Sequence, residues 1–217
     1  MNAEGQVASL PPNPRASHAD SSPKVMIMYF TSAGARRGGL TLEGSTLDKL
    51  SPGPHVALLS VDLMQRIVDG PCAPHAGSAV VRRSSRLAAA VRTSGGHVVW
   101  VRSERPGPVQ PDGSQLVDGI DRRPEDAELA KHTWGAFTNT SLAETLRRWQ
   151  ATTVWLTGIS TSHGVESTGR FADELGFDVV FVEDAMTATE AGDHAHSVQR
   201  IFPKLGPVVR HSDLLTD

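Results

Sequence analysis

Three features of this sequence combine residue types that can carry out proton-transfer chemistry. Asp62 lies near the end of the apolar run HVALLSVDLM, Lys131 lies in ELAKHTWGAFTNTSL, and the turn GISTSHG ends at Gly164. A carboxyl group can donate or accept a proton, and a nearby lysine stabilises its charged form. Each residue alone also fits an ordinary role, since strand-end acids often cap helices and single lysines are usually surface charges. Their order along the chain is more informative than any one of them.

Alternating strand and helix patterns would position these residues. Apolar runs predict strands at residues 55–64, 97–101, 152–158 and 177–185, with a short edge strand at 207–210. Helical spacing predicts helices at residues 78–94, 141–149, 164–175 and 190–200. The alternation predicts a three-layer, doubly wound, mostly parallel α/β sheet. Function in such sheets collects at the carboxyl ends of the strands, where Asp62, the loop carrying Lys131 and the GISTSHG turn all fall.

Composition narrows the class of protein. The length of 217 residues suits one domain. A net charge of −3, with no basic stripe, argues against a nucleic-acid partner. The single cysteine excludes an intramolecular disulfide, so we expect a cytoplasmic location. No apolar run approaches the roughly 20 residues that span a bilayer, and the N-terminus has no signal-peptide pattern, so we expect no membrane partner.

The N-terminal segment differs from the rest of the chain. Residues 1–23 are rich in Pro, Ser, Ala and Asn without an apolar period, which predicts a disordered tail. We therefore place the domain at residues 24–217, with residues 24–54 as an extension. Its apolar run VMIMYF could pair with the main sheet as an extra strand, or with another subunit as an exchanged arm. The second possibility predicts a homo-oligomer.

The order of acid, lysine and turn resembles the isochorismatase-like hydrolase superfamily, the cysteine hydrolases, which includes nicotinamidases, N-carbamoyl amidases and true isochorismatases. The resemblance spans residues 55 to about 210 and rests on KHTWGAFTNTSL, GISTSHGVEST and VEDAMTA. In that family an aspartate is the general base, a lysine lies between it and the nucleophile, and a cysteine attacks the substrate carbonyl. The resemblance assigns the first two roles to Asp62 and Lys131 and places Gly164 at the cysteine position. Glycine cannot form a thiolate, which argues against covalent acyl chemistry there.

The resemblance also implies a function for the rest of the turn. Family members often have a cis peptide here, which would fall between Ile159 and Ser160, and the backbone of the turn would cradle an anion. True isochorismatases also have glycine at this position, and they protonate an enol ether through the matching aspartic acid before water attacks. Such a role needs burial to raise the pKa of Asp62, whereas Lys131 would lower it.

These implications favour a hydrolase without a nucleophilic cysteine, acting on an ether or enol-ether bond of a small cyclic or carboxylated metabolite. Two alternatives stay open. One is a catalytically silent member that binds a metabolite or a partner. The other is amide hydrolysis by a water molecule that Asp62 activates as a base.

Further residues near the crevice have two possible roles each. His163 would orient substrate or pack beside the turn, and Trp134 and Phe137 would wall the pocket or fill the core. Arg102 and Arg105 would bind a substrate carboxylate or remain solvated loop charges.

Other nucleophiles and metal ligands are less well supported. Cys72, with His75 as its base, could be a displaced nucleophile, but free cysteines are usually small buried hydrophobes. Hydroxyls are also available near the turn, where serines commonly cap helices: Ser160, Ser162 and Ser167. The Asp-x-His metal cluster of nicotinamidase-like members is missing, and His194 and His196 would point in different directions on a helix. We therefore expect no metal ion and no other cofactor.

Overall fold

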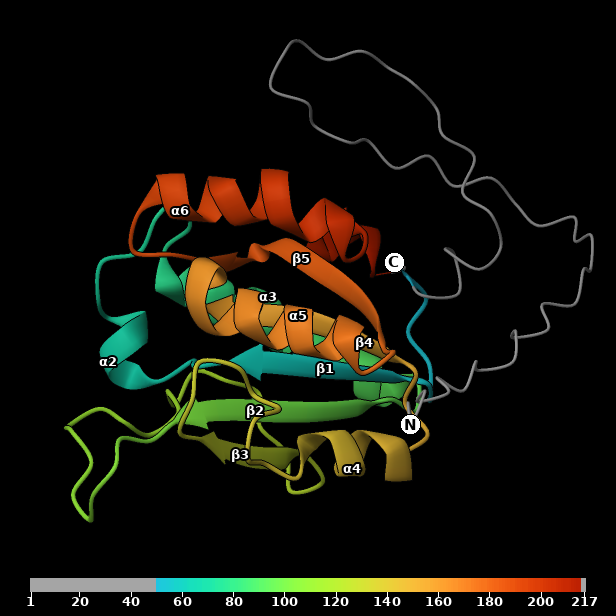
Figure 1. The fold of residues 1–217 in the computed structure, drawn as a ribbon, viewed down its shortest axis with the longest axis horizontal. Coiled ribbons are helices and arrows are strands. Elements are labelled where there is room, and N and C mark those ends of the chain that lie inside the picture. Colours follow the sequence, from blue (N-terminus) through green and yellow to red (C-terminus); the bar gives the residue numbers. More distant parts are fainter. Residues whose placement is uncertain (1–49, 216–217) are drawn as a thin grey trace, which may run out of the picture.

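The computed structural model describes residues 50–215, and these form a six-stranded sheet with helices on both faces (Figure 1). The strand order is β3-β2-β1-β4-β5-β6, and every neighbouring pair is parallel. The strands are β1 (Val56–Val61), β2 (His97–Ser103), β3 (Ala127–Lys131), β4 (Thr153–Ile159), β5 (Asp178–Thr187) and β6 (Val208–Val209). The prediction of a three-layer, mostly parallel α/β fold is confirmed. The predicted tail at 1–23 and residues 24–49 of the extension lie outside the described residues.

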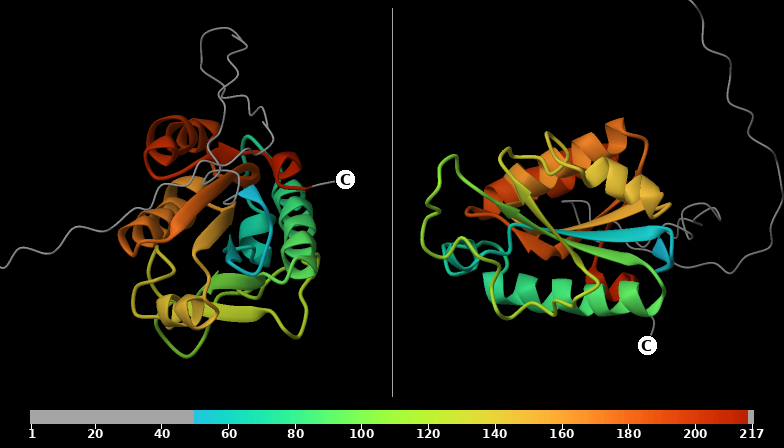
Figure 2. Two further views of the ribbon diagram at one scale, coloured as in Figure 1. Left: turned by 90° about the vertical axis from the view of Figure 1, so that its right-hand side faces the viewer. Right: turned by 90° about the horizontal axis from the view of Figure 1, so that it is seen from below.

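Helices cover both faces of the sheet (Figure 2), and an apolar core on each face holds the layers together. On one face α3 (Gly77–Thr93) buries the stripe Val80, Leu87 and Val91 against the sheet. The other face is covered by α4 (Leu142–Arg148), α5 (Glu166–Glu174), and α6 (Ala191–His196) with its continuation η2 (Ser197–Ile201). Three short elements complete the fold: α2 (Gln65–Val68), η3 (Phe202–Lys204) and η4 (His211–Asp213). No helix within residues 50–215 is long and apolar enough to cross a membrane.

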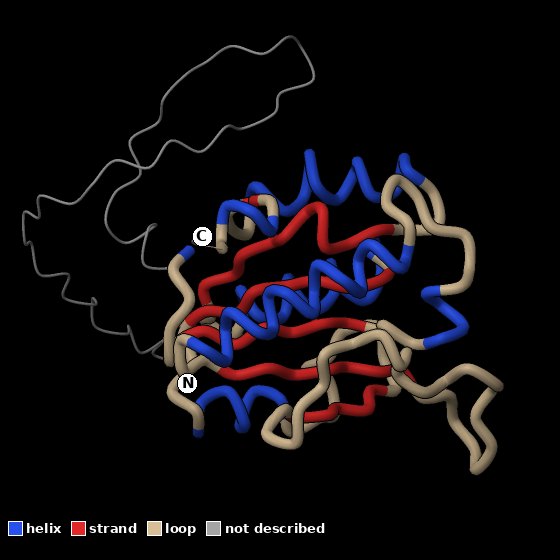
Figure 3. Tube along the Cα trace, turned by 180° about the vertical axis from the view of Figure 1, so that it is seen from behind, coloured by secondary structure: helices blue, strands red, loops and turns tan. Residues whose placement is uncertain are grey.

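The sheet reverses its winding between β1 and β4. The chain passes from β1 through α3 to β2 on one side, and β4 then pairs with the opposite side of β1. Such a switch point opens a crevice at the carboxyl ends of the two strands. Figure 3 shows the long loops gathered at one end of the sheet, the end at which β1 and β4 finish.

Gly158 allows β1 and β4 to finish side by side. Its φ is +123°, a conformation that favours glycine, and it pairs with Val61 across the two strands. A Cβ built at Gly158 would lie 2.0 Å from the Val61 carbonyl oxygen. The strand ends that carry Asp62 and Ile159 can therefore be adjacent only because residue 158 has no side chain.

Two predicted segments differ from the structure. Lys131 was expected in a loop, but it is the last residue of β3, an edge strand that takes its hydrogen bonds from β2. The sequence AELAK contains no β-branched residue, so its pattern gives no strand signal. The helix expected at 164–175 begins earlier, with the wide turn η1 (Thr161–Val165) leading into α5.

Candidate active site

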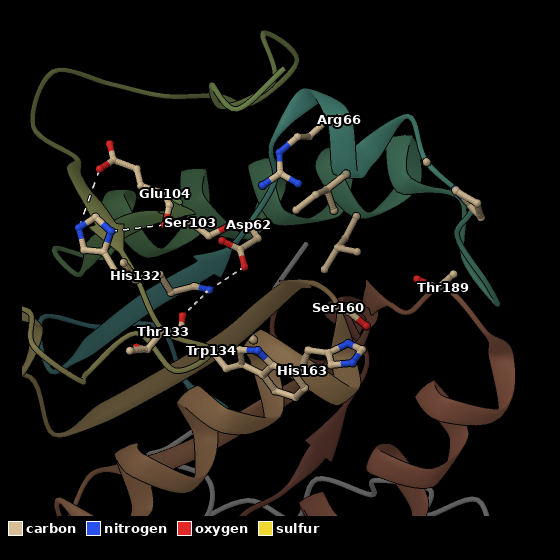
Figure 4. Close-up of a pocket in the computed structure, with 16 residues that line it drawn as sticks. Asp62, Arg66, Ser103, Glu104, His132, Thr133, Trp134, Ser160, His163 and Thr189 are labelled. Carbon is tan, nitrogen blue, oxygen red and sulfur yellow. Dashed lines mark hydrogen bonds and ion pairs between the residues drawn. The ribbon is translucent and has the colours of Figure 1, made fainter. Parts of the chain in front are cut away.

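A pocket of about 480 Å³ lies at the carboxyl ends of β1 and β4. The predicted site residues that line it are Asp62, Lys131, Trp134, Ile159, Ser160, His163 and Gly164. Figure 4 shows Asp62 on one side of the pocket and Ser160 and His163 on the other. The structure therefore brings together residues that are as much as 102 positions apart, from Asp62 to Gly164.

Asp62 and Lys131 form a buried ion pair on one side of the pocket. The Nζ atom of Lys131 lies 2.8 Å from Oδ2 of Asp62 and donates a second hydrogen bond, of 3.2 Å, to the carbonyl of Thr133. Lys131 is only 3% exposed. The backbone of Asp62 has a φ of 55°, in the left-handed region, where few residues other than glycine and asparagine are found. This conformation turns the residue out of β1 and into the crevice.

Burial raises the pKa of Asp62 above its ordinary value. Lys131, the neighbouring Ser103 side chain and Arg66 lower this pKa, but desolvation outweighs them. The second carboxylate oxygen, Oδ1, is buried and has no hydrogen-bond partner within the described residues. Because an unpaired buried oxygen disfavours the charged form, the protonated form of Asp62 is more stable than it would be in water.

The turn formed by residues 159–164, here called the cradle turn, makes the opposite side of the pocket. The peptide bond between Ile159 and Ser160 is cis, which confirms the expectation drawn from the resemblance. Gly164 faces Asp62 across the pocket. A Cβ built at Gly164 would lie 3.1 Å from Oδ2 of Asp62 and 3.0 Å from Cγ1 of Val61. Any side chain at position 164 would therefore press directly on the carboxyl group.

Thr168 in α5 fastens the cradle turn to the loop that follows β3. Its Oγ1 donates a 2.6 Å hydrogen bond to the carbonyl of Gly164 and accepts one of 3.1 Å from the amide of Ala136. Thr168 is fully buried. The same loop carries Trp134, whose ring meets the imidazole of His163 edge-on, with centroids 4.7 Å apart. Trp134 is 64% exposed and lies beside His163 at the pocket (Figure 4).

Three residues considered for substrate binding do not line the pocket. Phe137 is buried in the core and stacks with Phe177. The guanidinium of Arg102 pairs with Glu104 and Glu128, and these partners raise its pKa. Arg105 is exposed on the loop after β2. Arg102 lies within β2, which runs two residues beyond the predicted strand, and Arg105 follows it; neither lines the pocket.

Of the alternative nucleophiles, only Ser160 lines the pocket. Cys72 does not line the pocket; its thiol faces the carbonyl of Ile67 at 3.8 Å, and burial raises its pKa. A raised pKa leaves little reactive thiolate. Ser162 and Ser167 do not line the pocket either, whereas Ser160 does and keeps a buried, unpaired hydroxyl among the described residues.

Sequence reasoning missed several residues that line the pocket, of which Arg66 bears most on chemistry. Arg66 lies in α2, four residues after Asp62, and its Nε donates to the Ser114 hydroxyl at 3.3 Å. A guanidinium facing the pocket can bind a substrate anion. The signal was its position just after the strand-end acid. The other missed residues are Ile67, Gly70, Pro71, Ser103, Glu104, His132, Thr133 and Thr189.

The fold and the site together define a doubly wound α/β protein with an acid and lysine pair at its switch point. The chain belongs to the isochorismatase family, because the model of the isochorismatase domain matches residues 56–213. Members of this family are hydrolases. This chain is 36% identical to the isochorismatase family protein YecD of Escherichia coli O157:H7 over 176 residues, which cover 73% of this chain and 94% of YecD.

Solved structures agree with this assignment. An isochorismatase family protein from Burkholderia thailandensis superimposes with a TM-score of 0.68 at 35% identity, covering 74% of this chain and 94% of that one. N-carbamoylsarcosine amidase from Thermoplasma acidophilum superimposes with a TM-score of 0.62 at 26% identity, covering 72% and 96% of the two chains.

Proposed function

We propose that this chain is a hydrolase in which Asp62 transfers a proton to the substrate and no cysteine nucleophile takes part. Gly164 stands at the position where the resemblance places the family's cysteine. The preferred reaction is hydrolysis of an ether or enol-ether bond in a small cyclic or carboxylated metabolite. The observation that carries this proposal is the buried carboxyl of Asp62, with its raised pKa, directly facing a residue without a side chain.

The geometry supports a defined sequence of proton and bond changes. The carboxylic acid of Asp62 gives its proton to the terminal carbon of the enol ether, which leaves an oxocarbenium ion on the substrate. Lys131, 2.8 Å away, stabilises the carboxylate that this step produces. Water then adds to the cation and returns a proton to Asp62, and the resulting hemiketal separates into an alcohol and a ketone. No covalent bond to the protein forms at any stage.

The remaining pocket residues support binding of a ring that carries an anionic group. Arg66 can pair with a carboxylate, and the backbone of the cradle turn at Ile159 and Ser160 lies opposite. Trp134 and His163 offer aromatic faces and edges for a ring. Because Gly164 has no side chain, nothing from position 164 presses on the carboxyl group of Asp62.

Amide hydrolysis is the second candidate, and a specific comparison favours it. A relative at 26% identity is an N-carbamoylsarcosine amidase. In this chain the carboxylate of Asp62 would then take a proton from water as the water attacks the amide carbonyl. Asp62 would return that proton to the departing nitrogen, so that the C–N bond breaks and ammonia leaves. The raised pKa of Asp62 favours the ether reaction, since a general acid must be protonated before it acts.

The test is a substrate panel assayed with three forms of the protein. Enolpyruvyl ethers are followed by pyruvate release and amides by ammonia release. We expect pyruvate release by the wild type, a loss of at least about 100-fold in Asp62→Asn, and unchanged turnover in Cys72→Ser. Loss of turnover in Cys72→Ser would overturn the proposal. Ammonia release without pyruvate release would favour the amidase, and tight ligand binding without turnover, unaffected by Asp62→Asn, would favour a silent binding protein.

Two further predictions concern the assembly of the chain and its location in the cell. They are the homo-oligomer, based on the VMIMYF run, and the cytoplasmic location, based on the single cysteine. Light scattering on the full chain and on a chain without residues 25–30 tests the first prediction. Loss of assembly only in the shortened chain is the expected result.

A further inference from the structure

Outside the pocket, three potential metal ligands from three separate segments come together. His75 lies in the loop between α2 and α3, Glu183 lies in β5, and His194 lies in α6. One ligand atom from each residue lies within 4.8 Å of the other two. Figure 1 shows the loop after α2 rising toward the start of α6. None of the three residues lines the pocket.

We propose that His75, Glu183 and His194 bind one divalent transition-metal ion, with zinc preferred. Two imidazoles and one carboxylate are a donor set that zinc commonly takes in proteins. The site is distinct from the Asp-x-His pattern considered in the sequence analysis. His194 and His196 do point in different directions, since His194 is buried and His196 is exposed. His194 instead lies beside His75 and Glu183, which are distant from it in sequence.

Each of the three residues has one donor atom left for a metal. The Nε2 atom of His75 is buried, makes no hydrogen bond within the described residues, and lies 3.7 Å from Oε2 of Glu183. The other oxygen of Glu183, Oε1, pairs with Arg210 at 3.3 Å, which leaves Oε2. The Nδ1 atom of His194 is hydrogen bonded to the Thr161 hydroxyl at 2.9 Å, which leaves Nε2.

An ion pair between His75 and Glu183 is the competing explanation of this cluster. At 3.7 Å, however, the pair has no hydrogen bond, and the buried nitrogen stays unsatisfied. An ion pair also gives no role to His194, whose ring meets that of His75 edge-on at 5.7 Å.

The shape of β5 explains how Glu183 reaches this position. The register with β4 shifts between the pairs Leu156–Phe181 and Gly158–Met186, so β5 contains extra residues over this stretch. Such an irregularity redirects side chains locally.

The ligand atoms lie wider apart than the roughly 3.3 Å that follows from tetrahedral bonds of about 2.0–2.1 Å, so binding requires them to draw together. The side chains of His75 and Glu183 are each 23% exposed, which leaves both of them room to adjust.

The site would position the cradle turn rather than take part in chemistry. The imidazole of His194 would donate through Nδ1 to Thr161, which immediately follows Ser160 in the cradle turn. Second contacts of this kind fix the orientation of a metal-bound imidazole. A metal ion would therefore fasten α6, β5 and the loop after α2 to the back of the pocket wall.

Zinc titration of the metal-free full chain tests this proposal. Calorimetry should give one Zn²⁺ per chain, and zinc should raise the melting temperature. Co²⁺ should give the visible absorption of a four-coordinate site. His75→Gln and Glu183→Gln should each weaken zinc binding at least about ten-fold and abolish the rise in melting temperature.

His196→Gln is the matched control, because His196 is exposed on the same helix. It should bind zinc as the wild type does. Each variant is compared with its own metal-free melting temperature, which separates a folding defect from lost binding. The proposal is overturned if the wild type binds no zinc, or if binding persists unchanged in both His75→Gln and Glu183→Gln.

Discussion

Replacing Gly158 by alanine tests how the structure positions the two halves of the pocket. The new Cβ would lie 2.0 Å from the carbonyl oxygen of Val61 and 2.6 Å from its amide nitrogen. Real Cβ atoms do not approach other atoms so closely, so β1 and β4 must separate at their ends. The φ of +123° adds strain for any residue with a Cβ.

The two costs can be estimated separately. The backbone conformation costs about 1–3 kcal/mol for a residue other than glycine. Forcing the packed strands apart costs about another 1–3 kcal/mol. Alanine restricts the unfolded chain and so restores about 0.4–1 kcal/mol. Taking the middle of each range, we expect Gly158→Ala to lower the free energy of unfolding by about 3 kcal/mol, a large share of the 5–15 kcal/mol typical of a domain.

Urea unfolding measures this loss, and a second glycine provides the control. With a slope of about 2 kcal/mol per molar, the midpoint should fall by about 1.5 M. Gly192 lies in α6, and a Cβ there meets nothing within 4 Å. Gly192→Ala should therefore be neutral or stabilise by up to about 1 kcal/mol. A Gly158→Ala protein that unfolds within about 1 kcal/mol of the wild type, with an unchanged slope, would refute the reasoning.

Three further predictions concern the acid and its neighbours. If Asp62 acts as a general acid, kcat/KM should fall as pH rises through its raised pKa, whereas a general base would give a rise over the same range. Lys131→Met removes the charge that lowers this pKa, so the fall should move to higher pH. In this variant the folded state holds the proton of Asp62 more tightly than the unfolded state does. The variant's free energy of unfolding should therefore decrease as pH rises toward the new pKa of Asp62. An equal free energy of unfolding, measured in urea at pH 5 and at pH 8, would contradict this. Gly164→Ala places a methyl group 3.1 Å from Oδ2 of Asp62 and should lower turnover at least about ten-fold, while urea unfolding changes by no more than about 1 kcal/mol, since alanine also favours the helix. Wild-type turnover in that variant would show that the acid tolerates a neighbour.

Local pattern was enough to predict most of the sheet. The runs that became β1 and β4 are mostly apolar, because both strands are buried on both faces. Their ends predicted the location of Asp62 and of the cradle turn. The cis bond between Ile159 and Ser160 came from the resemblance, since nothing in the local residue types requires it.

The residues that sequence reasoning misplaced depend on long-range contacts. The edge strand that ends at Lys131 exists because β2 offers hydrogen-bonding groups, which its own sequence does not reveal. Arg102 lies inside β2 rather than after it, and its guanidinium pairs with the acidic neighbours Glu104 and Glu128 instead of lining the pocket. Phe137 lies in a segment that carries pocket residues, yet it packs into the core. The three potential metal ligands around His75 are as much as 119 positions apart, from His75 to His194, so no local sequence motif could predict the cluster.

The hydrogen bonds of Thr168 have a consequence for how substrate preference can vary. One buried hydroxyl joins the backbone of Gly164 to that of Ala136, so the two walls of the pocket are held at a separation set from within the core. Substrate and solvent do not reach Thr168, which is fully buried. Exposed residues such as Trp134 can therefore change identity without altering that separation. One buried residue fixes the distance between the pocket walls, and different, exposed residues are available to contact a ligand. Selectivity can therefore change while the framework of the pocket stays constant.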